Sequence, residues 1–127
     1  MADENAPTFA IAERPTRQYP RGGGVEYDGG TVFSLRPDPA KSDESLTRLV
    51  KEVLGRSGYR YGDWFDLPMP LYLVHDDHTG DTFRVGIRDG AVELYVLPTT
   101  EPAGLRAFYE RLLETAETEW DVLRRTD

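Results

Sequence analysis

MPLYLVHDDHTGDTFRVGIRDGAVELYVLP, residues 69–98, is the stretch that decides the fold, because it predicts three short strands joined by two turns. The dipeptide Asp89-Gly90 lies between two runs of alternating apolar and polar residues. It favours a two-residue hairpin turn, since both central residues of a type I′ turn need a positive φ. The residues that this register places on one face are all apolar: Phe83, Val85, Ile87, Val92, Leu94 and Val96. The residues that it places on the other face are Arg84, Gly86, Arg88, Glu93 and Tyr95.

The other turn in this stretch has the sequence Asp-His-Thr-Gly and ends at Gly80. It fits a type I turn followed by a left-handed glycine that forms a bulge. This geometry places Leu71 and Leu73 on the apolar face of the sheet. Since side chains alternate along a strand, Tyr72 and Val74 then join the polar face.

Two further segments have the apolar spacing of helices. One helix is predicted to begin at Ser42, whose side chain suits an N-cap, and to end at a glycine. The second is predicted over 101–125, because a stripe of apolar side chains continues along it. At about 1.5 Å per residue this helix is longer than the neighbouring strands, so Trp120 and Leu123 are expected to overhang the sheet.

Residues 1–24 contain three prolines and three consecutive glycines, and they are predicted to form a loosely ordered arm. Residues 25–35 indicate another hairpin around an Asp-Gly-Gly sequence. Residues 25–127 are therefore predicted to form a single α+β domain. It has two layers, an antiparallel sheet of four to five strands with two helices packed on one face, in the order β-β-α-β-β-β-α.

The composition excludes several classes of protein. There are 23 acidic and 15 basic residues, for a net charge of −8, and only two of the basic residues are lysine. There is no cysteine, no apolar run long enough for a membrane helix, and no secretory signal at the start, so a cytoplasmic location is expected. The acidic, lysine-poor composition fits a halophilic host, and a GC-rich genome explains the same bias. The net negative charge disfavours nucleic acid or anionic membranes as partners.

The residues that suggest catalysis are few. His75, His78 and Asp81 are ligand types for a metal-dependent hydrolase, although the predicted pairing points His75 toward the apolar side of the sheet. No serine lies in a Gly-x-Ser-x-Gly sequence. Turn-forming roles explain the same residues, so no metal and no cofactor are predicted, and a metal-dependent hydrolase is only the second alternative function.

Three groups of residues are candidates for binding. The first is the polar sheet face, with Tyr72, Arg84, Arg88 and Tyr95. The second is the aromatic segment 58–70, with Tyr59, Tyr61, Trp64 and Phe65. The third is the end of the predicted long helix, with Trp120 and Leu123.

These groups support two non-enzymatic hypotheses. The first is a protein–protein interaction module, most simply a homodimer, because Tyr, Trp and Arg are enriched at interfaces. The alternative is a binder of a small ligand or of single-stranded nucleic acid, since aromatic side chains beside arginine can stack on bases.

Overall fold

The computed structural model describes residues 9–11, 13–19, 21–23, 26–56, 58–62, 71–116 and 118–126. Its helices and strands follow in the order β1 (Thr16–Gln18), β2 (Glu26–Asp28), β3 (Thr31–Asp38), α1 (Asp43–Leu54), β4 (Tyr59–Gly62), β5 (Leu71–Asp76), β6 (Thr82–Arg88), β7 (Ala91–Tyr95), α2 (Pro102–Thr115) and β8 (Glu119–Thr126).

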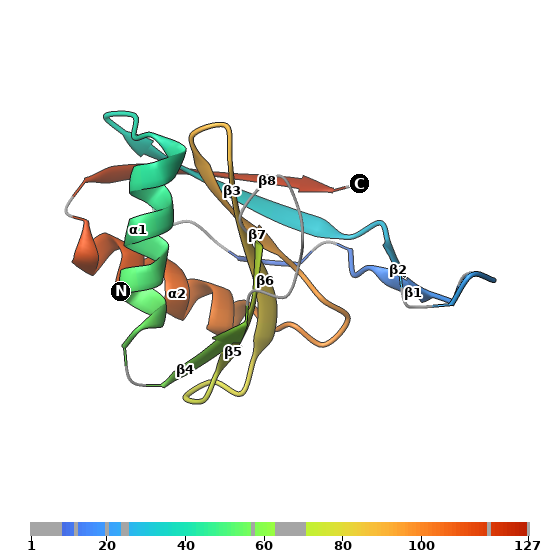
Figure 1. The fold of residues 1–127 in the computed structure, drawn as a ribbon. Helices are drawn as coiled ribbons and strands as arrows, with labels where there is room; N and C mark the ends of the chain where they lie inside the picture. The colour runs from blue at the N-terminus through green and yellow to red at the C-terminus, as the bar shows by residue number, and fades with distance from the viewer. Residues whose placement is uncertain are drawn as a thin grey trace.

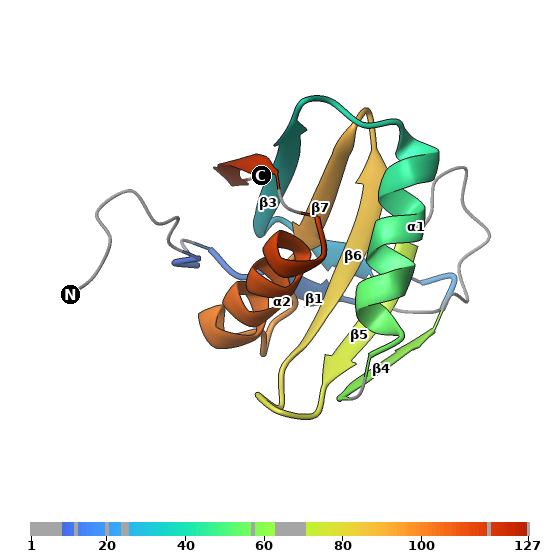
Figure 2. The same ribbon diagram turned by 90° about the vertical axis from the view of Figure 1, so that its left-hand side faces the viewer.

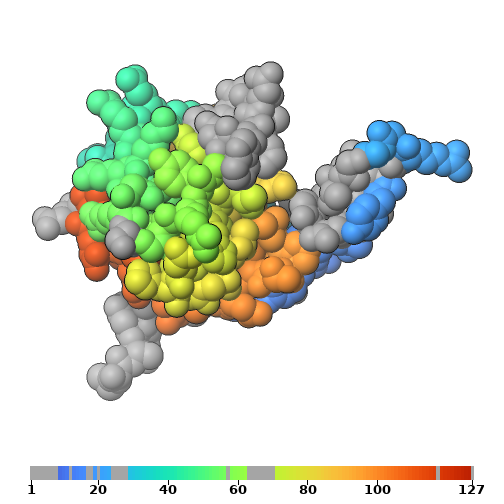
Figure 3. Space-filling model, turned by 60° about the horizontal axis from the view of Figure 1, so that its bottom comes forward, coloured from blue at the N-terminus to red at the C-terminus, as the bar shows by residue number. Residues whose placement is uncertain are grey.

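The main body has two layers, a sheet and a pair of helices on one of its faces (Figures 1 and 2). The sheet has six strands in the order β4-β5-β6-β7-β3-β8, and every neighbouring pair is antiparallel. The predicted α+β class is thus confirmed, with more strands than the four to five expected. A separate ribbon of β1 and β2 stands away from the body (Figure 3).

The Asp89-Gly90 hairpin is confirmed, with Arg84 opposite Tyr95 and Val85 opposite Leu94. Asp89 has φ 53° and Gly90 has φ 76°, as a type I′ turn requires. The apolar side chains of this hairpin are buried under the helices.

The predicted register of the turn at Gly80 is wrong by one residue. The backbone N–H of Asp76 donates to the carbonyl of Asp81 at 2.9 Å, and Thr82 lies opposite His75 rather than Asp76. Gly80 itself has the predicted left-handed conformation, with φ 78°. A one-residue shift exchanges the two faces of a strand. Tyr72 is therefore in the core with 2% of its surface exposed, and Leu73 is on the opposite face, beside Arg84.

Helix α1 begins as predicted, because the Ser42 side chain accepts a hydrogen bond from the backbone N–H of Ser45 at 3.1 Å. It ends at Gly55. Its buried face consists of Leu46, Leu49, Val50, Val53 and Leu54.

The predicted helix over 101–125 is wrong in its second half. Helix α2 ends at Thr115, and β8 runs back along β3, from Glu119 beside Asp38 to Thr126 beside Thr31. Trp120 and Leu123 are therefore in an edge strand rather than on an overhanging helix.

The hairpin predicted over 25–35 is also wrong. Strand β2 pairs with β1, whereas β3 pairs with β7 and β8 in the main sheet. The division into a loosely ordered arm of 1–24 and a domain of 25–127 stays a prediction. Phe9, from within that arm, is 1% exposed and packs its ring against Phe33 and Tyr109.

Candidate functional site

The sheet face opposite the helices carries a buried carboxylate, Glu93, whose side chain is only 4% exposed. Its oxygens lie 2.9 Å from Nη2 of Arg125 and 3.4 Å from Nε of Arg88. The hydroxyl of Tyr95 donates a hydrogen bond to the same carboxylate at 2.9 Å. The pKa of Tyr95 is raised to about 12. The main cause is burial, followed by the hydrogen bond to Glu93 and the negative charge of Glu93.

This group of four side chains, the Glu93 cluster, spans β6, β7 and β8. It brings together two predicted site residues, Arg88 and Tyr95, and the charges of its two arginines are partly matched by Glu93. Val32 and Leu71 on the same face are also buried, at 5% and 9% exposed. Of the two tyrosines that the nucleic-acid hypothesis places on this face, Tyr72 is in the core and the hydroxyl of Tyr95 is bonded to Glu93.

Strand β8 is the more accessible feature. It is an edge strand, and all eight of its residues pair with β3 on one side. Among the described residues no strand pairs with its other side (Figure 2). Its side chains alternate, so Trp120 is 8% exposed whereas Leu123 is 65% exposed.

A shallow groove of about 370 Å³ lies beside the opposite edge of the sheet. Its described lining residues are Arg60, Tyr61, Gly62, Leu73, His75 and Thr82. Tyr61 is 44% exposed, whereas Trp64 and Phe65 lie outside the described residues.

Polar contacts fix the rim of this groove. Arg60 donates two hydrogen bonds to Oδ1 of Asp77, at 2.7 and 3.1 Å, and they lower the pKa of that carboxyl group. Nδ1 of His75 is 2.9 Å from Oγ1 of Thr82, and its Nε2 is 3.6 Å from Oδ1 of Asp77. His75 is thus on the outer face, and its predicted orientation toward the apolar side is wrong because of the same register shift.

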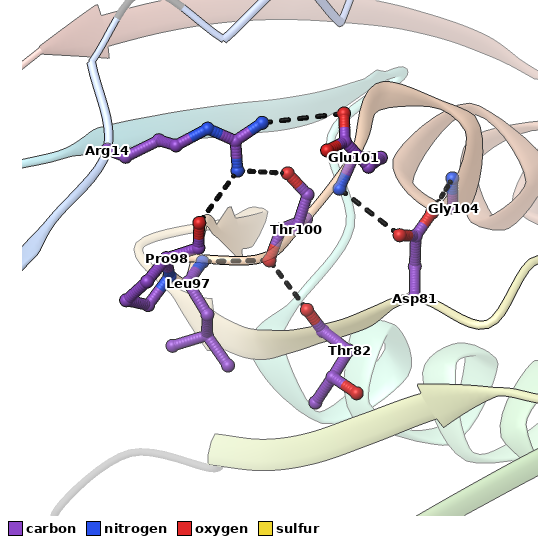
Figure 4. A network of polar contacts seen from close by, with 8 residues as sticks. All are labelled: Arg14, Asp81, Thr82, Leu97, Pro98, Thr100, Glu101 and Gly104. Atoms are coloured by element: carbon purple, nitrogen blue, oxygen red, sulfur yellow. Dashed lines mark hydrogen bonds and ion pairs between the residues drawn. The ribbon is translucent and has the colours of Figure 1, made fainter.

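The residues considered for a metal have other roles. Within the described ranges, no three His, Cys, Asp or Glu side chains gather as metal ligands. Asp81, the residue before β6, is 6% exposed and caps α2, accepting from the backbone N–H of Gly104 at 2.7 Å and of Glu101 at 3.2 Å (Figure 4).

The same network fastens the N-terminal segment to α2. Arg14 donates to the carbonyls of Pro98 and Thr100 and lies 3.4 Å from the Glu101 carboxylate (Figure 4). The Thr100 hydroxyl bonds to the Thr82 carbonyl. Sequence reasoning missed this network, since its contacts join segments up to 86 residues apart.

Tyr59, another predicted site residue, belongs to the core, with 9% of its surface exposed. The guanidinium of Arg111 lies 4.8 Å from the centre of its ring. Arg111 in turn lies 3.6 Å from the fully buried carboxylate of Asp76. These contacts join β4, β5 and α2, and they indicate that Tyr59 stabilises the fold.

No family model, curated protein or solved structure matches this chain. No helix in the described part of the chain is long and apolar enough to cross a membrane.

Proposed function

We propose that this protein is a non-enzymatic interaction module that forms a homodimer through the open edge of β8. The observation that supports this most directly is an edge strand of eight residues whose outer side pairs with no strand in the described part of the chain, and on which Leu123 is exposed. The unpaired N–H and C=O groups of an edge strand are a template for another strand.

The edge of β8 lacks several features that usually prevent such pairing, although four of its eight residues are charged. Glu119–Thr126 contains no proline, no glycine and no lysine, and it pairs with β3 without a bulge along its length. The other edge strand, β4, has only four residues. Strand addition therefore favours β8 over β4.

A second copy is the partner proposed, because the strand carries both signs of charge along its length. Asp121 lies two residues before Leu123 and Arg125 lies two residues after it. An antiparallel copy reverses this order, so opposite charges can face each other.

The test is the mass in solution by light scattering over a range of protein concentrations. The expected mass is twice that of the chain at the higher concentrations. Leu123→Asp should raise the dissociation constant by about tenfold or more, since it removes two exposed leucines and adds two carboxylates. Tyr19→Asp is the matched control, because Tyr19 is 70% exposed on another segment. A wild-type protein that stays monomeric throughout would contradict the proposal.

A second candidate function is the binding of a small ligand in the groove beside His75. Its volume of about 370 Å³ is within the usual range for small-molecule sites. An NMR titration with adenosine monophosphate tests it, with the backbone amide signals of the lining residues Leu73 and Thr82 as the readout. A shift of these signals that His75→Ala abolishes would support this function, and unchanged amide signals at saturating nucleotide would count against it.

A further inference from the structure

We infer that the second copy pairs with β8 about a two-fold axis at Leu123, so that Asp121 of each copy lies opposite Arg125 of the other. This inference rests on the proposed dimer and specifies its register. It joins the two main sheets edge to edge into one continuous antiparallel sheet.

The symmetry limits the possible registers. An isologous antiparallel pair has its axis perpendicular to the sheet, and the same face of both copies then points the same way. Opposite residues must therefore come from the same face. In β8 the outer face carries Asp121, Leu123 and Arg125, which lie beside Arg36, Ser34 and Val32 of β3.

An axis at Leu123 gives the most favourable set of neighbours. The two exposed leucines then contact each other at the centre, and an Asp121–Arg125 pair lies on each side of them. Opposite charges facing across an antiparallel pair contribute about 0.2–1 kcal/mol each. Residues 120–126 of each copy take part in the pairing.

Other registers bring unfavourable neighbours together. An axis at Asp121 sets two aspartates opposite each other, and an axis at Arg124 or Arg125 sets two arginines opposite each other. An axis at Val122 allows Glu119–Arg125 pairs, but it places the exposed Leu123 opposite Asp121. That last register is the main competitor, so the experiment must separate it from the one proposed.

Arg125 also contacts its own chain, because its Nη2 lies 2.9 Å from the Glu93 carboxylate. Glu93 is in β7, and β3 lies between β7 and β8, so this contact directs the guanidinium over the outer face and inward from the free edge. In the proposed register the guanidinium is therefore shared between Glu93 of its own chain and Asp121 of the second copy.

The absence of cysteine from the chain permits a direct test by disulfide cross-linking. Opposite residues of an antiparallel pair have Cα atoms about 4.5 or 5.5 Å apart, within the range of a disulfide. Leu123→Cys should therefore form a covalent dimer under mild oxidation. Tyr19→Cys, on the β1–β2 ribbon, is the exposed control and should not.

A mixture of two variants tests the register itself. Asp121→Cys alone should not cross-link, since its counterpart lies about 14 Å away along the strand. Mixed with Arg125→Cys, it should give the heterodisulfide as the main product. Because Arg125→Cys removes a partner of Glu93, the mass of each reduced variant is measured first to show that it still dimerises.

The outcomes separate the register from the dimer. Cross-linking of Leu123→Cys and of the Asp121/Arg125 mixture supports the inference. Dimers by mass that cross-link instead through Val122→Cys, or through Glu119→Cys mixed with Arg125→Cys, overturn the register and leave the proposed function standing. A monomeric wild-type protein overturns both.

Discussion

Asp81 and Gly104 show how closely two segments can depend on each other. The Asp81 carboxylate reaches the first turn of α2 only because position 104 has no side chain, and a Cβ there would overlap the Asp81 side chain. The helix has no cap from its own N-cap residue, Glu101. Asp81 supplies the acceptors instead.

Gly104→Ala should lower the free energy of unfolding by about 1–3 kcal/mol, because it displaces this cap. Helix propensity alone predicts the opposite sign, since alanine is favoured over glycine by about 1 kcal/mol inside a helix. Urea unfolding measures the difference. Gly22→Ala is the control, because a Cβ at Gly22 meets nothing within 4 Å. A stabilised Gly104→Ala protein would show that the cap is unimportant.

Tyr95 gives a prediction about pH. Its pKa is raised to about 12 in the folded protein from an ordinary value of 10.0, so folding favours the neutral phenol. The resulting stability is fully present below pH 10 and is lost as the pH rises toward 12. Tyr95→Phe removes this contribution together with the hydrogen bond to Glu93.

The wild type should exceed Tyr95→Phe by about 1 kcal/mol in unfolding free energy at pH 8, and the difference should shrink as the pH rises above 10. Tyr59 and Tyr109 also have raised pKa values, so both proteins lose some stability in this range. Urea unfolding at a series of pH values measures the difference, with Tyr19→Phe as an exposed control. A constant difference across the series would mean that Tyr95 does not titrate as described.

At the scale of elements, β8 places Trp120 and Leu123 on opposite faces, whereas a helix would place two residues three apart on the same face. Trp120→Ala should lower the free energy of unfolding by about 2–4 kcal/mol, because Trp120 belongs to the core and only 8% of its surface is exposed. Leu123→Ala should change it by less than about 0.5 kcal/mol, because Leu123 is 65% exposed. Unfolding at low protein concentration keeps dimerisation out of the comparison. Similar losses for the two variants would instead fit one face of a helix.

The elements that the sequence predicts correctly are those with a local chemical signal. The Asp89-Gly90 turn needs residues that accept positive φ, and α1 needs the Ser42 side chain at its start. Neither depends on a distant segment. The register at Gly80 fails because several loop closures suit the same four residues, and the choice between them moves every side chain of β5 to the other face.

The C-terminal segment fails for a different reason. Leu105, Phe108 and Leu112 have helical spacing, and Trp120 and Leu123 extend the same spacing by coincidence. No glycine or proline marks the end of α2 at Thr115. What makes 119–126 a strand is its pairing with β3, 81 to 95 residues earlier, which no local pattern contains.

The candidate site was predicted only in part for the same physical reason. Arg84, Arg88 and Tyr95 come together because the hairpin that carries them was predicted correctly. Tyr72 separates from them through the register shift. Glu93 was placed on this face, but its contact with Arg125 depends on β8 and could not be foreseen.

Across the whole molecule, the net charge of −8 opposes both compaction and the meeting of two copies. The range of these repulsions falls from about 30 Å at 0.01 M salt to about 3 Å at 1 M. Contacts such as the proposed Asp121–Arg125 pairs act over shorter distances and are screened less than repulsion between whole subunits. They set the register more than the affinity.

Molar KCl should therefore raise both the melting temperature and the dimer fraction relative to dilute buffer at pH 7. Calorimetry and light scattering on the same samples measure the two effects. The effect on melting should nearly vanish close to the isoelectric point, about 4.7, where the net charge is already small. Equal melting temperatures in dilute and concentrated KCl at pH 7 would remove the case for adaptation to salt. A dimer fraction that falls with KCl would mean that the paired charges, rather than Leu123 and the strand backbone, hold the two copies together.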